Sequence, residues 1–179
     1  MVMKENNTAG WEEAARIHSE AISNYIKLAE LLDDTAWKEP VSVGKWTPVE
    51  ITEHLRSTYE ILIREQESGV GLRPRAGFLL RTFLRLTILP GIYKKRRLPA
   101  GAKAPAEIRP VTCIEDKTEA LQQLREFGER FASLLGAKKD DPDVRLTHHL
   151  FGEFTPAKGL EFVTIHLENH IKQLPNVNE

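Results

Sequence analysis

Two histidines near the end of the chain, His166 and His170, are four residues apart within the segment 159–174. Apolar residues recur through this segment at three- and four-residue steps, which predicts an amphipathic helix with one buried stripe: Leu160, Val163, Leu167, Ile171 and Leu174. On a helix, this spacing places one imidazole a turn above the other, with Cβ atoms about 5–6 Å apart. Two neutral imidazoles so placed can bind one divalent cation at about 2.0–2.1 Å each. A metal site would need a third ligand from elsewhere in the chain.

His54 is the candidate for that third ligand. Thr47 fits a helix N-cap, Pro48 fits the first helical position and Glu50 completes a capping box, so a second helix should begin at Thr47 and run until Gly69. His54 lies two turns into this helix, at the edge of its apolar stripe. If this helix and the final one are neighbours, three imidazoles can meet between them, leaving metal positions for water or substrate. Three histidines suit Zn, Ni or Fe(II) better than Mg or Ca.

The rest of the chain must place these two helices side by side. A first helix is predicted over residues 10–34, and a third from Asp116, whose capping box includes Glu119, to Gly136. The final helix should continue until a proline at position 175, and no segment has the pattern of a strand. The prediction is an all-α four-helix bundle, with a short link between helices one and two and a long crossover between helices two and three. Residues 1–179 are expected to form a single domain.

The long crossover is strongly basic. Nine basic residues and no acidic one occur between Val70 and Lys103: Arg73, Arg75, Arg81, Arg85, Lys94, Lys95, Arg96, Arg97 and Lys103. We predict an extra short helix from Gly77 to Leu89 that ends at Pro90-Gly91, with its apolar residues buried: Phe78, Leu79, Leu80, Phe83 and Leu84. The segment could be a cationic, partly apolar patch for an anionic substrate, a phosphate or a membrane surface. We favour instead a crossover whose arginines are solvated or pair with acidic residues of neighbouring helices.

Charge, cysteine content and hydropathy narrow the class of protein. The net charge is −1 with neutral histidines, so the global charge offers no attraction for nucleic acid. The single Cys113 fits a reducing compartment and forms no intramolecular disulfide. The sequence shows no signal peptide and no run of about 20 apolar residues. We therefore expect a cytoplasmic protein with no stable membrane insertion.

Two motifs resemble a known family. The segment from Trp46 to Leu55 resembles the Trp-[Ser/Thr]-Pro…His-Leu motif of helix two in the DinB/YfiT-like metalloenzymes. The segment His149–Thr155, followed by His166–His170, resembles the closing section of that family. The resemblance implies a four-helix bundle, a divalent metal on His54 and the final two histidines, and usually a homodimer. Relatives include thiol-dependent S-transferases and a mycothiol-dependent isomerase. The basic crossover departs from the compact family pattern.

Five further residues are candidates for a pocket or for support of the metal ligands. Glu53 and Glu168 are each adjacent in sequence to a ligand, and Asn169 lies between the final pair, so any of them could orient an imidazole. Adjacency on a helix, however, directs their side chains elsewhere. His149 could approach the pocket mouth or anchor its loop. His18 lies on the apolar face of the first helix, where we favour a core histidine bonded to a backbone carbonyl over a pocket residue.

Two functions remain open. The first is a metal-dependent transferase or hydrolase of the DinB-like type that acts on a small molecule, with a low-molecular-weight thiol as co-substrate. The metal would act as a Lewis acid that deprotonates the thiol or water. The second is a non-catalytic binding module, in which the metal is structural or absent and the Arg73–Lys103 insert contacts an anionic partner. A structural zinc is normally closed by four protein ligands, whereas three histidines favour an open site. No residue is assigned as catalytic.

Overall fold

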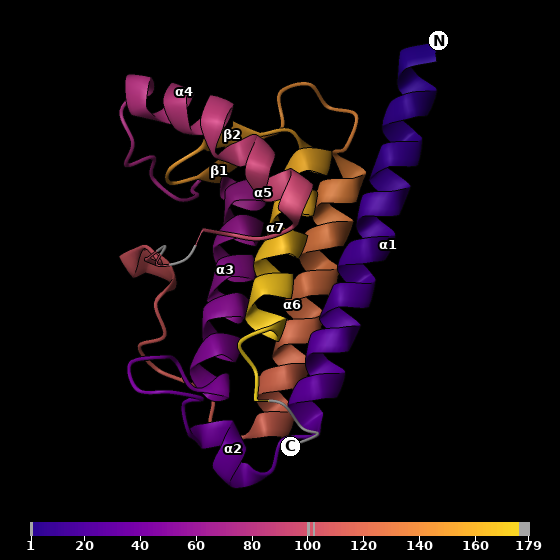
Figure 1. Ribbon diagram of the computed structural model, residues 1–179. Helices are drawn as coiled ribbons and strands as arrows, with labels where there is room; N and C mark the ends of the chain where they lie inside the picture. The colour runs from indigo at the N-terminus through magenta and orange to yellow at the C-terminus, as the bar shows by residue number, and fades with distance from the viewer. Residues whose placement is uncertain (1, 100, 102, 176–179) are drawn as a thin grey trace.

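Four long helices lie side by side in the computed structural model, which describes residues 2–99, 101 and 103–175 (Figure 1). They are α1 (Val2–Glu30), α3 (Pro48–Ser68), α6 (Lys117–Ala137) and α7 (Pro156–Ile171). Helix α1 packs against α6 and α7, and α3 packs against α6. Their inward stripes form a continuous apolar core around large, fully buried side chains such as Tyr25, Tyr59 and Phe131. The chain is predominantly helical, as the periodicity predicted. No helix in the described part of the chain is long and apolar enough to cross a bilayer.

The predicted start of helix α3 is confirmed in detail. The Thr47 side chain accepts a hydrogen bond from the Glu50 backbone N–H at 3.2 Å, and the Glu50 carboxylate accepts one from the Thr47 backbone N–H at 2.8 Å. Gly69 ends the helix with φ +73°, a conformation that glycine adopts without steric cost. Helix α6 also starts as predicted, with Asp116 accepting from the backbone N–H of Glu119, but the Glu119 carboxylate accepts from Gln123 and does not complete the predicted capping box. These signals are local, and they place His54 two turns into α3.

Three predicted helix ends were wrong. The first helix stops at Glu30, and Asp33 caps a separate short helix, α2 (Asp34–Lys38), which buries Trp37. Helix α7 ends at Ile171 rather than near the proline at position 175. Gly136 does not end α6 but lies within it, where an added Cβ would be 3.2 Å from the Trp11 ring. This glycine permits close helix packing rather than a turn.

The crossover contains two helices, α4 (Phe78–Thr87) and α5 (Leu89–Lys95), and a short 3₁₀ helix, η1 (Ala106–Ile108). The sequence predicted one helix that ended at Pro90-Gly91, but Pro90 lies in the first turn of α5, where proline is tolerated. The predicted burial was also wrong for most of the apolar residues, because these side chains are exposed: Phe78, Leu79, Leu80 and Phe83. Leu84 alone of that group packs against the core. Periodicity reports that a helix is amphipathic, not which face meets the protein.

A β-hairpin precedes α7, although no strand was predicted. Strands β1 (Leu146–His148) and β2 (Gly152–Phe154) pair antiparallel, with Thr147 opposite Glu153. The carboxylate of Glu65 on α3 accepts from the Thr147 backbone N–H at 3.0 and 3.1 Å, which ties the hairpin to the helices. Strands of three residues are too short for an alternating pattern to show in the sequence.

Candidate metal centre

Three histidines from two helices converge at one point. His54 projects from α3, and His166 and His170 project from α7. The Nε2 atom of His166 lies 3.0 Å from Nε2 of His54 and 3.1 Å from Nε2 of His170. One ring nitrogen from each residue therefore belongs to a single group whose members all lie within 4.8 Å of one another. The structure thus brings the three sequence-predicted ligands together.

Hydrogen bonds on the far side of two rings determine where the lone pairs point. Nδ1 of His54 donates to the backbone carbonyl of Ile108 at 2.6 Å, because a carbonyl can only accept. Nδ1 of His170 lies 3.0 Å from Oε1 of Gln173 and donates to it in the same way. In a neutral imidazole, only one nitrogen carries a proton, so Nε2 of both residues presents a lone pair toward His166.

This donor set fits a divalent transition metal ion. Two lone pairs face the third Nε2, and that atom can supply at most one proton, so the three nitrogens cannot all satisfy one another. Nitrogens that each bind one ion at about 2.0–2.1 Å are themselves roughly 3 Å apart when the angle at the ion is near 95°. The observed separations of 3.0 and 3.1 Å match that spacing. The hydrogen bonds from the opposite nitrogens are of the type that orients metal-binding histidines.

Burial keeps the three imidazoles neutral. It lowers the pKa of His54 and lowers the pKa of His170 to about 3, with neighbouring His54 adding to the effect on His170. The pKa of His166 is lowered well below its usual value by burial and by the two other histidines. His54 and His170 are buried, whereas His166 retains partial exposure. The cluster therefore offers neutral ligands near pH 7, and His166 is its most exposed member.

Trp46 covers part of the cluster. Its ring centroid lies 4.9 Å from that of His54 and 6.5 Å from that of His170, and it is nearly parallel to the His170 ring. Because Trp46 directly precedes the N-cap Thr47, the start of α3 positions both this indole and the His54 ligand. An aromatic surface beside the histidines limits water and gives the site an apolar wall.

Sequence reasoning missed three contributors to the site: Trp46 as a wall, the Ile108 carbonyl and Gln173. A signal existed for Gln173, because it follows His170 by three residues and such neighbours share a helix face. No signal existed for Ile108, since it acts through its backbone carbonyl from a distant part of the crossover.

The acidic and amide candidates do not contact the imidazoles. Glu53 forms an ion pair with Arg56 at 2.7 Å, and Glu168 forms a two-point ion pair with Arg96 at 2.6 and 3.0 Å. Asn169 accepts a hydrogen bond from a backbone N–H of the crossover and donates to a carbonyl of its own helix. Glu168 and Asn169 attach the crossover to α7, whereas Glu53 bonds to Arg56 and Ser57 of its own helix, so these three side chains do not orient the histidines by hydrogen bonds.

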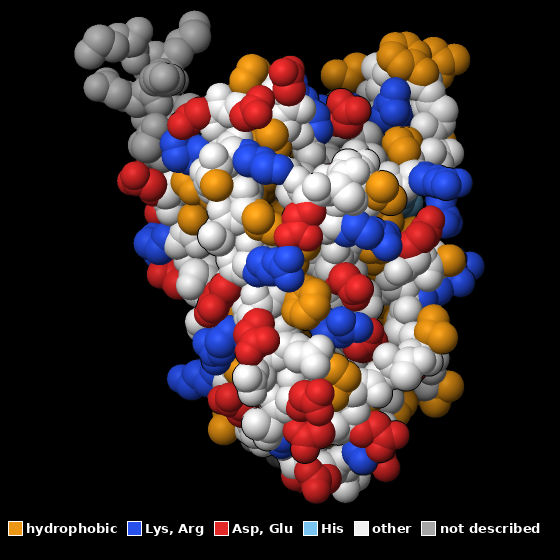
Figure 2. Space-filling model, turned by 180° about the vertical axis from the view of Figure 1, so that it is seen from behind, with side chains coloured by type: hydrophobic (Ala, Val, Ile, Leu, Met, Phe, Trp, Pro, Cys, Tyr) orange, Lys and Arg blue, Asp and Glu red, His pale blue; other side chains and the backbone are white. Residues whose placement is uncertain are grey.

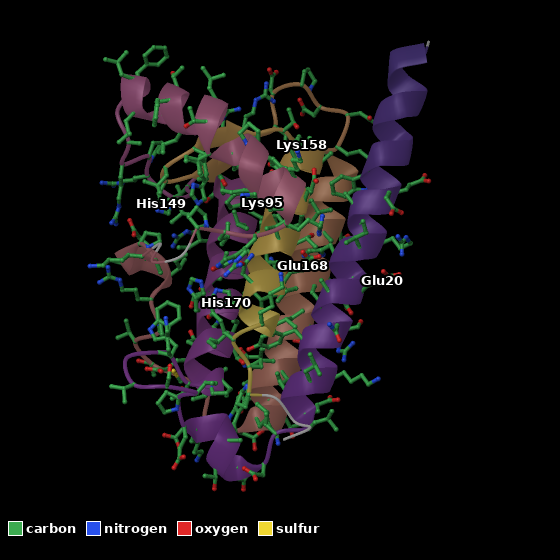
Figure 3. All side chains as sticks on the ribbon, viewed as in Figure 1. Glu20, Lys95, His149, Lys158, Glu168 and His170 are labelled. Carbon is green, nitrogen blue, oxygen red and sulfur yellow. The ribbon has the colours of Figure 1, made fainter. Side chains whose placement is uncertain are left out.

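His18 and His149 lie outside the cluster. Nε2 of His18 is 2.9 Å from the hydroxyl of Tyr59 in the core, so the predicted backbone-carbonyl partner was wrong. The carbonyl of His149 accepts from the backbone N–H groups of Arg75 and Ala76 at 2.8 and 3.3 Å, which anchors its loop to the crossover. Figure 3 shows His149 well apart from His170, and its Nδ1 is buried with no hydrogen-bond partner among the described residues.

The fold and the site together define the class of protein: a helical protein in which three imidazoles converge. The family model of the DinB superfamily matches residues 18–174, and the chain belongs to this superfamily. The matched range includes all three histidines of the cluster. Neither the search of curated proteins nor that of solved structures gave a match.

Proposed function

We propose that the chain binds one divalent transition metal ion, Zn, Ni or Fe(II), through the Nε2 atoms of His54, His166 and His170. The observation that carries this proposal is the approach of three neutral ring nitrogens at 3.0 and 3.1 Å, two of them held as lone-pair donors by hydrogen bonds on Nδ1. Three protein ligands leave coordination positions for an exogenous molecule, which is typical of catalytic rather than structural sites.

We propose one of two activities. The first is transfer of a thiol to a small electrophile, as in a DinB-like thiol-dependent S-transferase. The second is hydrolysis of a small molecule. When bound, the metal would lower the pKa of a low-molecular-weight thiol or of water so that the anion is available near neutral pH. The Ile108 carbonyl and Gln173 hold two imidazoles in one orientation, and Trp46 narrows access to water. A ligand would enter beside the partly exposed His166. We assign no general base, because Glu53 and Glu168 are engaged in ion pairs.

Two features of the architecture belong to the same proposal. We infer that α1, α3, α6 and α7 form the four-helix bundle of the superfamily in one domain spanning residues 1–179, and that two chains form a homodimer. Light scattering coupled to size-exclusion chromatography measures the latter directly. A monomer at every concentration would contradict the homodimer without affecting the metal proposal.

Metal analysis of protein purified without a histidine tag tests the site. We expect about one transition metal ion per chain in the parent and a loss of that metal in His166→Ala. His166 is partly exposed, so this variant should remain folded by circular dichroism. His149→Ala is the matched control, because it removes an imidazole outside the cluster and should retain the metal. Absence of metal in the parent, even after incubation with Zn²⁺ or Ni²⁺, would refute the proposal.

Activity assays separate an enzyme from a non-catalytic binding module. We expect thiol transfer or hydrolysis by the metal-loaded parent that is lost in His166→Ala and after chelation. A metal that is bound but supports no reaction with a range of thiols and electrophiles, combined with unfolding of His54→Ala, would indicate a structural metal. In that case, the basic Arg73–Lys103 insert is the feature left to contact a partner.

A further inference from the structure

Helix α4 meets the β-hairpin through two of its arginines. Nη1 of Arg85 donates to the backbone carbonyls of Phe151 and Glu153 at 2.9 and 2.7 Å. The side chain of Arg81 lies against the hairpin at Gly152, where an added Cβ would be 2.6 Å from Arg81 Cδ. Contacts with the hairpin therefore position the side chains of Arg81 and Arg85, and their guanidinium groups are less free to move than those of isolated surface arginines.

A cleft of about 420 Å³ lies between α4 and the hairpin segment. One wall is a single face of α4, with residues at i, i+3, i+4 and i+7: Phe78, Arg81, Thr82 and Arg85. The other wall is formed by Arg145, Glu153 and Thr155. A cleft of this volume lies within the range of small-molecule sites. Its lining contains none of the three converging histidines.

The cleft carries an excess of positive charge. Three guanidinium groups and one carboxylate line it, which leaves a net charge of +2. Among the side chains that the structure describes, Arg81, Arg85 and Arg145 form no ion pair, whereas other arginines of the crossover do, as in the pair of Arg75 with Glu107. Like charges that share a cleft repel one another unless an anion lies between them. The guanidinium fork matches the geometry of phosphate better than an ammonium group does.

Polar groups at two helix starts add to this environment. Phe78 is the first residue of α4, and its N-cap Gly77 provides no side-chain acceptor. Thr155 is the N-cap of α7 and makes no side-chain capping bond, so its hydroxyl can donate to a ligand. Both residues line the cleft, and the starts of helices favour negative charge.

An exposed apolar surface adjoins the cleft. On the face of α4 next to the one that lines the cleft, Leu79, Phe83 and Leu86 are 82%, 59% and 74% exposed. Figure 2 shows hydrophobic side chains gathered at one upper corner of the molecule, with lysine and arginine side chains below them. An amphipathic helix whose apolar face is exposed beside cationic groups is suited to ligands that combine an acidic head with an apolar chain.

We propose that this cleft binds the phosphate group of a ligand that carries an apolar chain, with Arg81, Arg85 and Arg145 holding the phosphate and α4 supporting the chain. The same chemistry is present in a soluble alkyl phosphate ester and in the headgroup of an anionic membrane lipid. The site is separate from the histidine cluster, so it stands or fails independently of the metal.

Titration calorimetry with inorganic phosphate and hexyl phosphate tests the cleft. The informative variant combines Arg81→Gln with Arg145→Gln and leaves Arg85, which holds the hairpin, unchanged. Lys94→Gln combined with Arg97→Gln is the matched control, because it also removes two charges, from exposed crossover residues that do not line the cleft. We expect hexyl phosphate to bind more tightly than inorganic phosphate, the double variant to lose at least about tenfold in affinity and the control to stay within about twofold of the parent.

Co-sedimentation with vesicles distinguishes the two sources of phosphate. Phosphatidylcholine vesicles with and without phosphatidic acid are the probes. Binding that requires phosphatidic acid and is lost in the arginine double variant would identify a lipid headgroup, and binding of hexyl phosphate alone would identify a soluble ester. If the double variant does not fold, Arg145→Gln alone serves, because this side chain is exposed and its hydrogen bond is to the carbonyl of the adjacent Val144.

Three results would overturn the proposal. The first is failure of the parent to bind any of the probes at millimolar concentration. The second is an equal affinity of the parent and the arginine variants for hexyl phosphate. The third is vesicle binding that survives loss of the arginines and disappears only in a Phe83→Ser, Leu86→Ser variant, since that would be simple adsorption of an apolar surface.

Discussion

The histidine in the core, His18, should make the stability of the fold sensitive to acid. Its Nε2 lies 2.9 Å from the Tyr59 hydroxyl, the side chain is 1% exposed, and burial lowers its pKa from 6.5 to about 4. The substitution His18→Gln removes the titrating group and keeps a polar atom that can bond to Tyr59. The comparison of interest is the acid dependence of the unfolding free energy in the parent and in this variant.

The sign follows from proton binding in the two states. Between the folded pKa of about 4 and the unfolded value of 6.5, the unfolded chain binds more protons at this residue, so stability increases with pH. The stabilisation from a neutral His18 is fully present above pH 6.5 and is lost as the pH falls toward 4. At pH 4.5, linkage gives a loss of about 2.5 kcal/mol relative to pH 8.

Urea unfolding followed by circular dichroism at pH 8, 6 and 4.5, with a chelator present, measures this difference. We expect the parent to lose about 2.5 kcal/mol more than His18→Gln between pH 8 and 4.5, because the other buried histidines titrate in both proteins and cancel. Tyr59→Phe is the control, since it removes the hydroxyl but keeps the imidazole and should retain the acid dependence of the parent. Parallel stability curves for the parent and His18→Gln would refute the reasoning.

Three further substitutions test individual contacts. Gln173→Leu should weaken Zn²⁺ binding about 10- to 100-fold in calorimetry while saturation still gives one ion per chain, and an unchanged affinity would exclude the amide as an orienting group. Glu168→Gln breaks a partly exposed ion pair with Arg96, so urea unfolding should change by less than about 1 kcal/mol and Zn²⁺ affinity should not change; a tenfold loss of affinity would show that Glu168 supports the ligands. Gly152→Ala should cost about 1–2 kcal/mol in thermal unfolding, because this residue has φ +72° and packs against Arg81, and a melting temperature equal to that of the parent would contradict this.

The parts of the fold that could be predicted depend on interactions within one turn of helix. Thr47 and Glu50 bond to each other's backbone N–H groups, so their spacing alone indicates where α3 begins. The exposed face of α4 could not be predicted, because Phe83 and its neighbours show the same periodicity whichever side meets the protein. The hairpin at Gly152 was missed for a different reason: each of its strands has only three residues, and its pairing depends on a turn rather than on a pattern.

In the candidate metal site, the spacing of residues along α3 and α7 was enough to predict the three histidine ligands. His166 and His170 share one helix face by geometry alone, and the apolar stripe of α3 directs His54 inward. The tautomer of His54 is set differently, by a carbonyl 54 positions away at Ile108. Every residue type has a backbone carbonyl, so the type of residue at position 108 does not indicate that its carbonyl accepts this hydrogen bond.

The crossover is therefore part of the site as well as a connection between helices. On α7, Glu168 and Asn169 occupy the positions beside the ligands, and they bond to Arg96 and to the backbone N–H of Leu98 in the crossover. These contacts attach the crossover to the helix that carries two ligands, and the same segment then supplies the Ile108 carbonyl to the third. Glu168 and Asn169 were candidates for direct support of the imidazoles because they are adjacent to the ligands in sequence, but they bond to the crossover instead. They anchor the part of the crossover around Arg96 and Leu98, and a later part of the same crossover orients the lone pair of His54 through Ile108.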